Sequence, residues 1–425
     1  MTDFSVEAFH NEYLPEGSAT MSAVVTVTAE GGGDGGTKPA EGVAEIIIVD
    51  TSGSMEQPSS KIRAARRATA EAIEEIRDGV WFAVIAGDND ANPVYPHTGM
   101  IEASPSTRAE AVAAAKGLDS GGGTAISTWL ALARDLFLSR PAGVRHAILL
   151  TDGKNESEVP AQLDQVLGTC VGVFQCDCRG VGTQWEVAEL RKISSALLGT
   201  VDIIPKPDEL EAAFRSMMAS AMSKGIAQVS LRVWAPQGAT VNFVRQVAPA
   251  IEDLTEKATS VNPMTQDFPL GAWGDESRDY HLQVTVKPGA VGAEMLAARV
   301  TLMVGEESVG QALVRAVWTE DEALSARIAP QVAHYTGQAE LASAIQEGLE
   351  ARKAGDDRTA TVKLGRAVQL AKQSGNDGTI KLLGKVVDIE DADTGTVRLK
   401  REVEAVDEMA LDTRSTKTVR VGDKK

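Results

Sequence analysis

The sequence predicts an α/β fold: a doubly wound, mostly parallel sheet inserted in an antiparallel β-sandwich and followed by a small helical region. Short apolar segments alternate with helical patterns between residues 44 and about 223, which is the order of a parallel sheet covered by helices. Residues 227–319 instead contain strand-like segments separated by Gly and Pro turns, as in antiparallel sheets. A single strand-like segment at 19–29 precedes both regions, and it needs partner strands further along the chain.

The alternating region supplies the elements of the parallel sheet. Its strand-like segments are residues 44–50, 81–87, 145–152, 170–176 and 200–205. Its helical patterns are residues 58–77, 106–117, 126–138, 159–167, 184–197 and 207–224. Because the strands are almost continuously apolar, we expect helices on both faces of the sheet. In such open sheets a ligand binds beyond the carboxyl ends of the strands, so the loops at those ends are the expected site.

The whole chain divides into five expected parts. They are an N-terminal strand with a linker (1–42), an α/β domain (43–225), a β-sandwich (226–319), a helical domain (320–389) and a tail (390–425). We expect the strand at 19–29 to join the β-sandwich, and the Gly-rich segment 30–42 to be a flexible connection. The tail is polar and Thr-rich with few large apolar side chains, so we expect it to be disordered.

Composition narrows the class of function. The formal net charge is −18 over 425 residues, without a basic stripe, which argues against a nucleic-acid-binding protein. The first residues lack the pattern of a signal peptide, and no apolar run is long enough to span a membrane. The three cysteines, Cys170, Cys176 and Cys178, do not form the framework of a secreted disulfide protein. We therefore expect a cytoplasmic protein with cysteines buried in a core strand.

Oxygen-bearing side chains crowd the end of the first α/β strand. Asp50, Ser52 and Ser54 occupy alternate positions there, so one carboxylate and two hydroxyls can turn toward a common point. Two further loops are expected at the same edge of the sheet. One places Thr124 after three glycines, and the other places Asp152 at the end of a buried strand. Ligands that are all oxygen suit Mg²⁺, Mn²⁺ or Ca²⁺ rather than zinc.

This set of segments resembles the metal-ion-dependent adhesion site of the von Willebrand factor A family. The family pattern is Asp-x-Ser-x-Ser, followed by a Thr in a later loop and an Asp at a later strand end. It is complete here as Asp50, Ser52, Ser54, Thr124 and Asp152, and the resemblance covers about residues 44–224. It implies that both serines bind a cation directly, that Thr124 does so in the ligand-competent state, and that both aspartates act partly through water.

The resemblance also implies a function. A dication held by only two carboxylates stays electrophilic and can accept a Glu or Asp of a partner protein, and such a shell favours Mg²⁺ with retained waters. The arrangement is similar to bacterial cytoplasmic proteins that are associated with Ser/Thr kinases, phosphatases and forkhead-associated domains. We therefore expect a non-enzymatic scaffold or adaptor in intracellular signalling or complex assembly, without nucleic-acid or membrane partners.

Two other interpretations of the site remain open. The first motif could be a tight turn whose Ser and Asp side chains cap the next helix. A metal-dependent hydrolase would need a general base beside the ion, for which Asp88 or Asp90 could serve. The chain has neither a phosphate-binding P-loop nor a nucleophile elbow.

The tail suggests a second kind of function. Thr413, Thr416 and Thr418 lie in a basic segment of an otherwise acidic chain, where phosphorylation would create a ligand for arginine-lined domains. Thr416 and Thr418 each have a valine three residues later, which resembles ligands of forkhead-associated domains. The alternative function is a kinase substrate whose tail is bound by such a domain; the other possibility is an unmodified solubilising tail.

Overall fold

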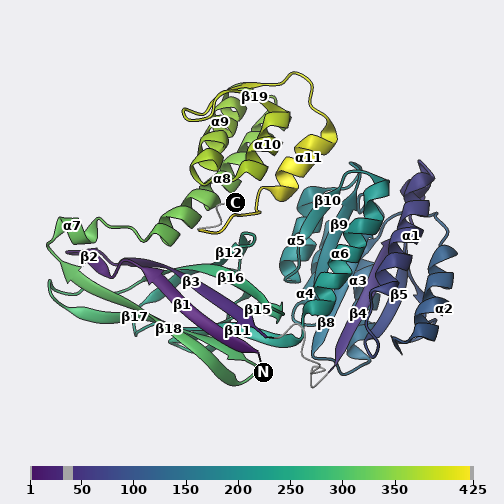
Figure 1. Ribbon diagram of the computed structural model, residues 1–425, viewed down its shortest axis with the longest axis horizontal. Helices are drawn as coiled ribbons and strands as arrows, with labels where there is room; N and C mark the ends of the chain where they lie inside the picture. The colour runs from purple at the N-terminus through teal and green to yellow at the C-terminus, as the bar shows by residue number, and fades with distance from the viewer. Residues whose placement is uncertain (1, 32–41, 422–425) are drawn as a thin grey trace. The chain divides into compact units, whose positions relative to one another are not determined.

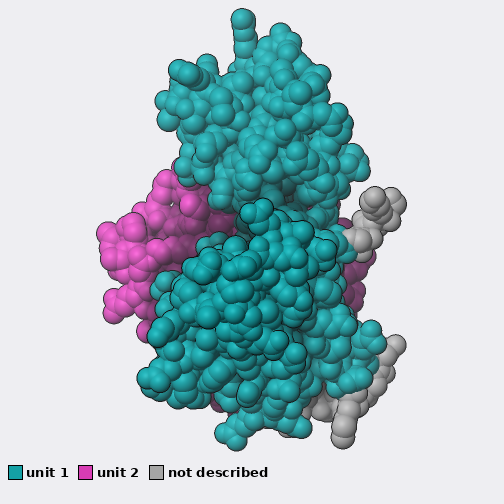
Figure 2. Space-filling model, turned by 90° about the vertical axis from the view of Figure 1, so that its left-hand side faces the viewer, with its two compact units in different colours: residues 1–31, 228–271, 275–425 teal, residues 32–227, 272–274 magenta. Residues whose placement is uncertain are grey.

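The computed structural model describes residues 2–31 and 42–421, so most of the flexible connection expected at 30–42 lies outside the described residues. The chain forms two compact units (Figures 1 and 2). One consists of Met1–Gly31, Gln228–Gly271 and Asp275–Lys425, and the other of Gly32–Ala227 with Ala272–Gly274. The second unit is therefore inserted into the first along the chain. No helix in the described ranges combines the length and the apolar character needed to cross a bilayer.

The inserted unit is built on one seven-stranded sheet. Its strands are β4 (Val43–Asp50), β5 (Trp81–Gly87), β6 (Ala91–Tyr95), β7 (Ile101–Glu102), β8 (Val144–Thr151), β9 (Gln175–Val181) and β10 (Val201–Ile204). Their order is β10-β9-β8-β4-β5-β6, with β7 also paired to β5. The strands β10, β9, β8, β4 and β5 are parallel, whereas β6 and β7 run antiparallel to β5. All eight residues of the central β4 are buried.

Helices cover both faces of this sheet, as the sequence predicts. They are η1 (Gly53–Glu56), α1 (Ser60–Glu74), α2 (Pro105–Lys116), α3 (Ile126–Leu138), α4 (Pro160–Cys170), α5 (Val187–Ala196), η2 (Pro207–Glu209) and α6 (Leu210–Ser223). The helices α1, α2 and α6 pack on one face, against Ile47 and Val49 of β4. Successive residues of a strand point to opposite faces, so Ile46 and Ile48 face the layer of α3, α4 and α5 (Figure 1). The doubly wound α/β class is confirmed.

One predicted strand is wrong. Residues 170–176 were expected as a strand, but helix α4 runs through Cys170 and β9 begins only at Gln175. Gly172 has φ +76°, and a left-handed glycine just after a helix ends it. The apolar composition of this segment therefore belongs to a helix end and a turn. All three cysteines are buried, with Cys176 and Cys178 in β9.

The sandwich of the other unit consists of two sheets that contact each other through β1 and β18 (Figure 1). The first sheet has the order β1-β3-β16-β12-β13 and the second β14-β15-β11-β17-β18-β2. Their strands are β1 (Asp3–His10), β2 (Tyr13–Pro15), β3 (Thr20–Glu30), β11 (Ile226–Trp234), β12 (Thr240–Ala248), β13 (Glu252–Asp253), β14 (Thr259–Asn262), β15 (Thr265–Trp273), β16 (Glu276–Thr285), β17 (Glu294–Val304) and β18 (Glu307–Thr319), with η3 at Thr255–Lys257. The strand expected at 19–29 is β3, which pairs with β1 and β16.

A helical region follows the sandwich. Its elements are α7 (Glu322–Ser325), α8 (Pro330–Lys353), α9 (Asp357–Gln373), α10 (Asp377–Val386), β19 (Val387–Asp391), β20 (Thr396–Leu399) and α11 (Ala405–Arg414). The expectation of a disordered tail at 390–425 is wrong for the residues that the structure describes. Although the segment has few apolar side chains, Val397 and Leu411 enter the core of the helical region. A small number of well-placed apolar contacts is enough to order it.

The last described residues are bound to the sandwich. Ile251 N donates to Thr416 O at 2.8 Å, and Thr418 Oγ1 donates to Val247 O at 2.7 Å. The Thr413 side chain is buried, with 1% exposed. The three threonines therefore do not lie in an exposed, unstructured tail. Their phosphorylation stays a prediction, and at Thr413 a kinase could reach the hydroxyl only after local unfolding.

Candidate metal centre

Asp50 anchors the site at the carboxyl end of the central strand. Its side chain is buried, and Oδ1 accepts a hydrogen bond from Ser52 N at 2.7 Å while Oδ2 accepts one from Thr151 Oγ1 at 2.5 Å. Burial raises the pKa of Asp50 to about 6, against the hydrogen bonds from Ser52 and Thr151, which lower it. The site therefore contains a carboxylate whose charge the protein stabilises only in part.

The two serines of the motif connect Asp50's loop to Asp152. Ser52 Oγ lies 2.9 Å from Ser54 Oγ, and Ser54 Oγ donates to Asp152 Oδ1 at 2.6 Å. Ser54 belongs to the short helix η1, whose turn brings its hydroxyl beside that of Ser52. Asp152 directly follows β8, the parallel neighbour of β4. Adjacent parallel strands thus bring two distant acidic residues to the same edge of the sheet.

The loop that contains Thr124 is held against the first motif by its backbone. Gly53 N donates to Gly122 O at 3.0 Å, and Thr124 N donates to Ser157 Oγ at 3.0 Å. Gly122 has φ +76°, a conformation that favours glycine. A Cβ on Gly123 would lie 2.0 Å from Ser157 Oγ. The glycines preceding Thr124 therefore allow the close backbone approach that the sequence indicates.

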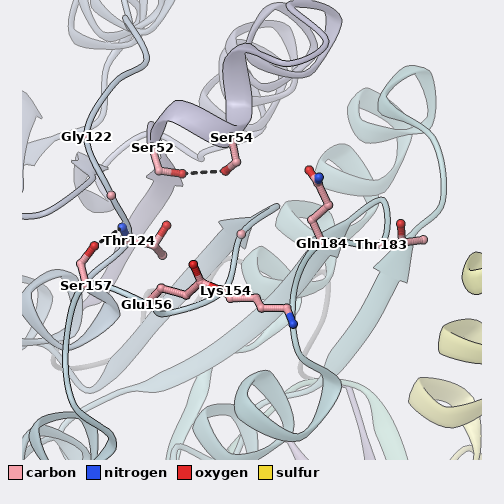
Figure 3. Close-up of a pocket in the computed structure, with 11 residues that line it drawn as sticks. Ser52, Ser54, Gly122, Thr124, Lys154, Glu156, Ser157, Thr183 and Gln184 are labelled. Atoms are coloured by element: carbon pink, nitrogen blue, oxygen red, sulfur yellow. Dashed lines mark hydrogen bonds between the residues drawn. The ribbon is translucent and has the colours of Figure 1, made fainter. Parts of the chain in front are cut away.

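The candidate ligands converge above Gly153. An ideal Cβ on this glycine would lie 3.1 Å from Ser54 Oγ, 3.1 Å from Thr124 Oγ1 and 3.8 Å from Asp50 Oδ2. Figure 3 shows the hydroxyls of Ser52, Ser54 and Thr124 facing the same cavity. Together with the Ser54–Asp152 hydrogen bond, these distances bring all five predicted residues to one place.

Lys61 is a member of the site that sequence reasoning missed. Its Nζ lies 2.5 Å from Asp152 Oδ2 and 2.8 Å from Gln184 Oε1. Lys61 stands near the start of α1 in a segment rich in basic residues, so nothing in its own sequence context separates it from Arg63 or Arg66. Only the packing of α1 beside the end of β8 reveals its role.

Comparisons with known proteins give the family. A model described as the von Willebrand factor type A domain matches residues 46–154, and one described as the von Willebrand factor type A C-terminal domain matches residues 369–415. The solved structure of a von Willebrand factor type A protein from Catenulispora acidiphila is 49% identical, with a TM-score of 0.94, over 99% of this chain and 97% of that one. The chain belongs to the von Willebrand factor type A family.

More distant structures share the fold of this von Willebrand factor A (VWA) protein. The ArnB paralog VWA2 from Sulfolobus acidocaldarius is 14% identical, with a TM-score of 0.62, over 99% of this chain and 100% of that one. The human COPII-coat protein Sec24c is 10% identical, with a TM-score of 0.51, over 90% of this chain and 58% of that one. A search of curated protein sequences finds no match. The C-terminal family match includes β19, β20 and α11, the segment that was expected to be disordered.

Domains of the VWA family typically hold a divalent cation at a metal-ion-dependent adhesion site, and the donors present here fit such an ion. Every predicted ligand atom is a hydroxyl or carboxylate oxygen, which is the donor type of hard divalent cations. Within residues 2–31 and 42–421, no cluster of three His, Cys, Asp or Glu side chains could hold a metal. A cation would therefore depend on the serine and threonine hydroxyls as well as on Asp50 and Asp152.

The side chains of Ser52, Ser54 and Thr124 face a cavity of about 560 Å³. Its lining residues are Ser52, Ser54, Gly122, Gly123, Thr124, Gly153, Lys154, Glu156, Ser157, Thr183 and Gln184 (Figure 3). The cavity is large enough for an amino-acid side chain to enter beside the hydroxyls. A carboxylate from another molecule could thus reach a cation held by Ser52, Ser54 and Thr124.

The residues considered as hydrolytic bases are not on the described wall of the metal cavity, although the Asp88 side chain lies beside Gly122. Asp88 lines a different cavity of about 440 Å³, and Asp88 Oδ1 accepts a hydrogen bond from Asp90 N at 2.9 Å. Neither aspartate is among the described residues that line the metal cavity. The geometry therefore gives no support to either residue as a base beside the cation.

Proposed function

We propose that this VWA protein is a non-enzymatic interaction protein. In this proposal a divalent cation, with Mg²⁺ as the preferred ion, is bound by Asp50, Ser52, Ser54, Thr124 and Asp152. The cation captures a Glu or Asp side chain of a protein partner. The observation that carries the proposal is the convergence of three hydroxyls at the wall of an open cavity, with the two buried carboxylates of Asp50 and Asp152 beside them.

The charge of the donors supports capture of a carboxylate. Hydroxyl ligands are neutral, so the bound dication would be opposed only by two carboxylates, one of which already pairs with Lys61. A cation in such a shell keeps a positive field toward the cavity. Mg²⁺ retains water molecules in sites with few carboxylates, and a partner carboxylate can replace one of them.

We place this interaction in the cytoplasm, in signalling or in the assembly of a complex. All three cysteines are unpaired and buried, which supports a compartment that keeps thiols reduced. The net charge of −18 supports protein rather than nucleic-acid partners.

The test compares capture of partners by the full chain with and without EDTA. Wild type in Mg²⁺ is expected to retain proteins from a lysate that EDTA releases, and Asp50→Ala is expected to lose the same proteins. Thr183→Ala is the matched control, because Thr183 lines the cavity but is not a predicted ligand. Capture that is equal in Asp50→Ala and wild type, and insensitive to EDTA in both, would contradict the proposal.

A further inference from the structure

Lys61 is held beside the cation site by three contacts. Its Nζ lies 2.5 Å from Asp152 Oδ2, 2.8 Å from Gln184 Oε1 and 3.5 Å from Ser54 O. Lys61 is 8% exposed and Asp152 is fully buried. A lysine is seldom so buried unless it is paired, so this ammonium is part of the site's construction.

The two oxygens of Asp152 have different partners. Oδ2 faces Lys61, whereas Oδ1 accepts the hydrogen bond from Ser54 Oγ at 2.6 Å. Lys61 and Ser54 Oγ therefore contact different oxygens of the carboxylate. A cation that approaches through Ser54 and Oδ1 does not have to displace the ammonium group.

The charge balance of the site depends on this lysine. Asp50 and Asp152 contribute two negative charges and Lys61 one positive charge, so the ionised site carries −2 + 1 = −1. Binding of a dication changes this sum to +1. Without the lysine the loaded site would be neutral and would attract an external carboxylate less strongly.

We propose that Lys61 is a positioning residue that sets the charge of the cation site. It keeps Asp152 in place when no ion is bound, lowers the affinity of the site for the ion, and leaves the loaded site positively charged toward an acidic ligand. The last of these effects rests on the proposed function, whereas the first two concern the ion alone.

The test measures Mg²⁺ affinity by calorimetry in chloride and again in acetate, which serves as the carboxylate probe. Lys61→Met is expected to bind Mg²⁺ at least about tenfold more tightly in chloride, because a neighbouring positive charge is removed. In wild type, acetate is expected to strengthen Mg²⁺ binding, since coupling between two ligands is reciprocal. In Lys61→Met the effect of acetate is expected to be smaller.

Matched variants separate charge from structure. Lys61→Arg keeps the charge and is expected to behave as wild type. Lys154→Met removes a lysine that lines the cavity and pairs with Glu186 rather than with a ligand carboxylate, and it is expected to leave Mg²⁺ affinity unchanged. Lys61→Gln, which can still donate to Asp152, repeats the comparison if Lys61→Met does not fold.

Thermal unfolding with and without Mg²⁺ gives an independent readout. Mg²⁺ is expected to raise the unfolding temperature of Lys61→Met more than that of wild type. If the lysine were merely structural, Mg²⁺ would raise both unfolding temperatures by the same amount. The inference is overturned if the neutral variants bind Mg²⁺ no more tightly than wild type and gain no extra stability from it. If wild type binds Mg²⁺ but acetate has no effect on that binding, the proposed capture of a carboxylate is wrong. The effect of Lys61 on the ion is then tested by the Mg²⁺ affinities in chloride alone.

Discussion

Ser54 Oγ donates a 2.6 Å hydrogen bond to Asp152 Oδ1, although 98 residues separate the two along the chain. The bond joins the loop after β4 to the end of β8, its parallel neighbour. A hydroxyl and a carboxylate oxygen are thereby held side by side. Because both groups are already positioned, little ordering of side chains is needed to complete the site.

Ser54→Ala is expected to weaken Mg²⁺ binding by at least about tenfold, since it removes one hydroxyl donor and the group that orients Asp152 Oδ1. The fold should remain intact, because an alanine fits the same space. Titration calorimetry measures the affinity. Ser59→Ala is the control, since Ser59 is exposed and its hydroxyl accepts a hydrogen bond from Arg63 rather than from a residue of the site. Equal affinities of Ser54→Ala and wild type would contradict the ligand assignment.

Asp152→Ala is expected to lower the free energy of unfolding in EDTA by about 3 kcal/mol, because it leaves the Lys61 ammonium buried without its carboxylate. The double variant Asp152→Ala/Lys61→Met should be less destabilised than the sum of the two single variants. Urea unfolding of wild type, the two single variants and the double variant measures this double-mutant cycle. Simple additivity would show that the two groups are not coupled.

Gly153→Ala is expected to reduce Mg²⁺ affinity by about tenfold with a small effect on stability, because Mg²⁺ tolerates little distortion of its ligands. The added Cβ would lie 3.1 Å from both Ser54 Oγ and Thr124 Oγ1, so these oxygens must shift. Gly121→Ala is the control, since a Cβ there meets nothing within 4 Å. The two variants should differ clearly in calorimetry and little in thermal unfolding.

A buried histidine at the opposite end of the same strands predicts a pH dependence of stability. His146 Nδ1 lies 3.0 Å from both Glu45 oxygens, and Nε2 lies 3.2 Å from Asp177 Oδ2. Burial opposes the charged imidazole, but Glu45 and Asp177 outweigh it and raise the pKa of His146 to about 9. Burial also raises the pKa of Glu45, whereas hydrogen bonding and charge attraction from His146 lower that of Asp177 despite its burial.

The pH dependence has a definite sign. A histidine whose pKa is higher in the folded state stabilises the fold fully below its unfolded pKa of about 6.5, and this contribution disappears as the pH rises through about 9. The raised pKa of Glu45 acts in the same direction, and Asp177 stays ionised throughout this range. Stability should therefore fall by about 3 kcal/mol between about pH 6.5 and 9.5. The urea concentration at the unfolding midpoint, measured at each pH, follows this change in stability. His146→Gln should make stability less dependent on pH, whereas His97→Gln, at an exposed position, should leave the dependence unchanged.

Arg420→Ala is expected to destabilise the unit that contains the sandwich by about 1–2 kcal/mol. Arg420 Nη2 donates to Asp279 Oδ1 at 2.7 Å, and the same carboxylate accepts hydrogen bonds from Tyr335 and Thr26. The variant should also make the segment after α11 more sensitive to limited proteolysis. Arg398→Ala is the control, because Arg398 is 71% exposed and pairs only with Glu390 among its described contacts. Equal proteolysis of both variants would contradict this role of the C-terminal segment.

The sequence predicted more of the inserted domain than of the rest. Parallel strands buried on both faces have a strong apolar signature, and β4, β5 and β8 lie within one residue of their predicted bounds. The strand that is β9 was predicted too early in the chain, because the end of α4 and the turn after it have an equally apolar composition. The tail was misassigned for a different reason: Val397 and Leu411 are too few to register in composition, yet both are buried in the core of the helical region.

For the candidate site, the sequence by itself predicted the five oxygen-bearing side chains that the structure brings together. Asp50, Ser52, Ser54, Thr124 and Asp152 stand in loops at the carboxyl ends of strands, or beside the start of a helix, and that position follows from the order of the elements. Only the tertiary structure decided that Lys61 pairs with Asp152. The position of an ammonium group at the end of a long side chain depends on how α1 packs beside β8, and no local pattern in the chain encodes that distance.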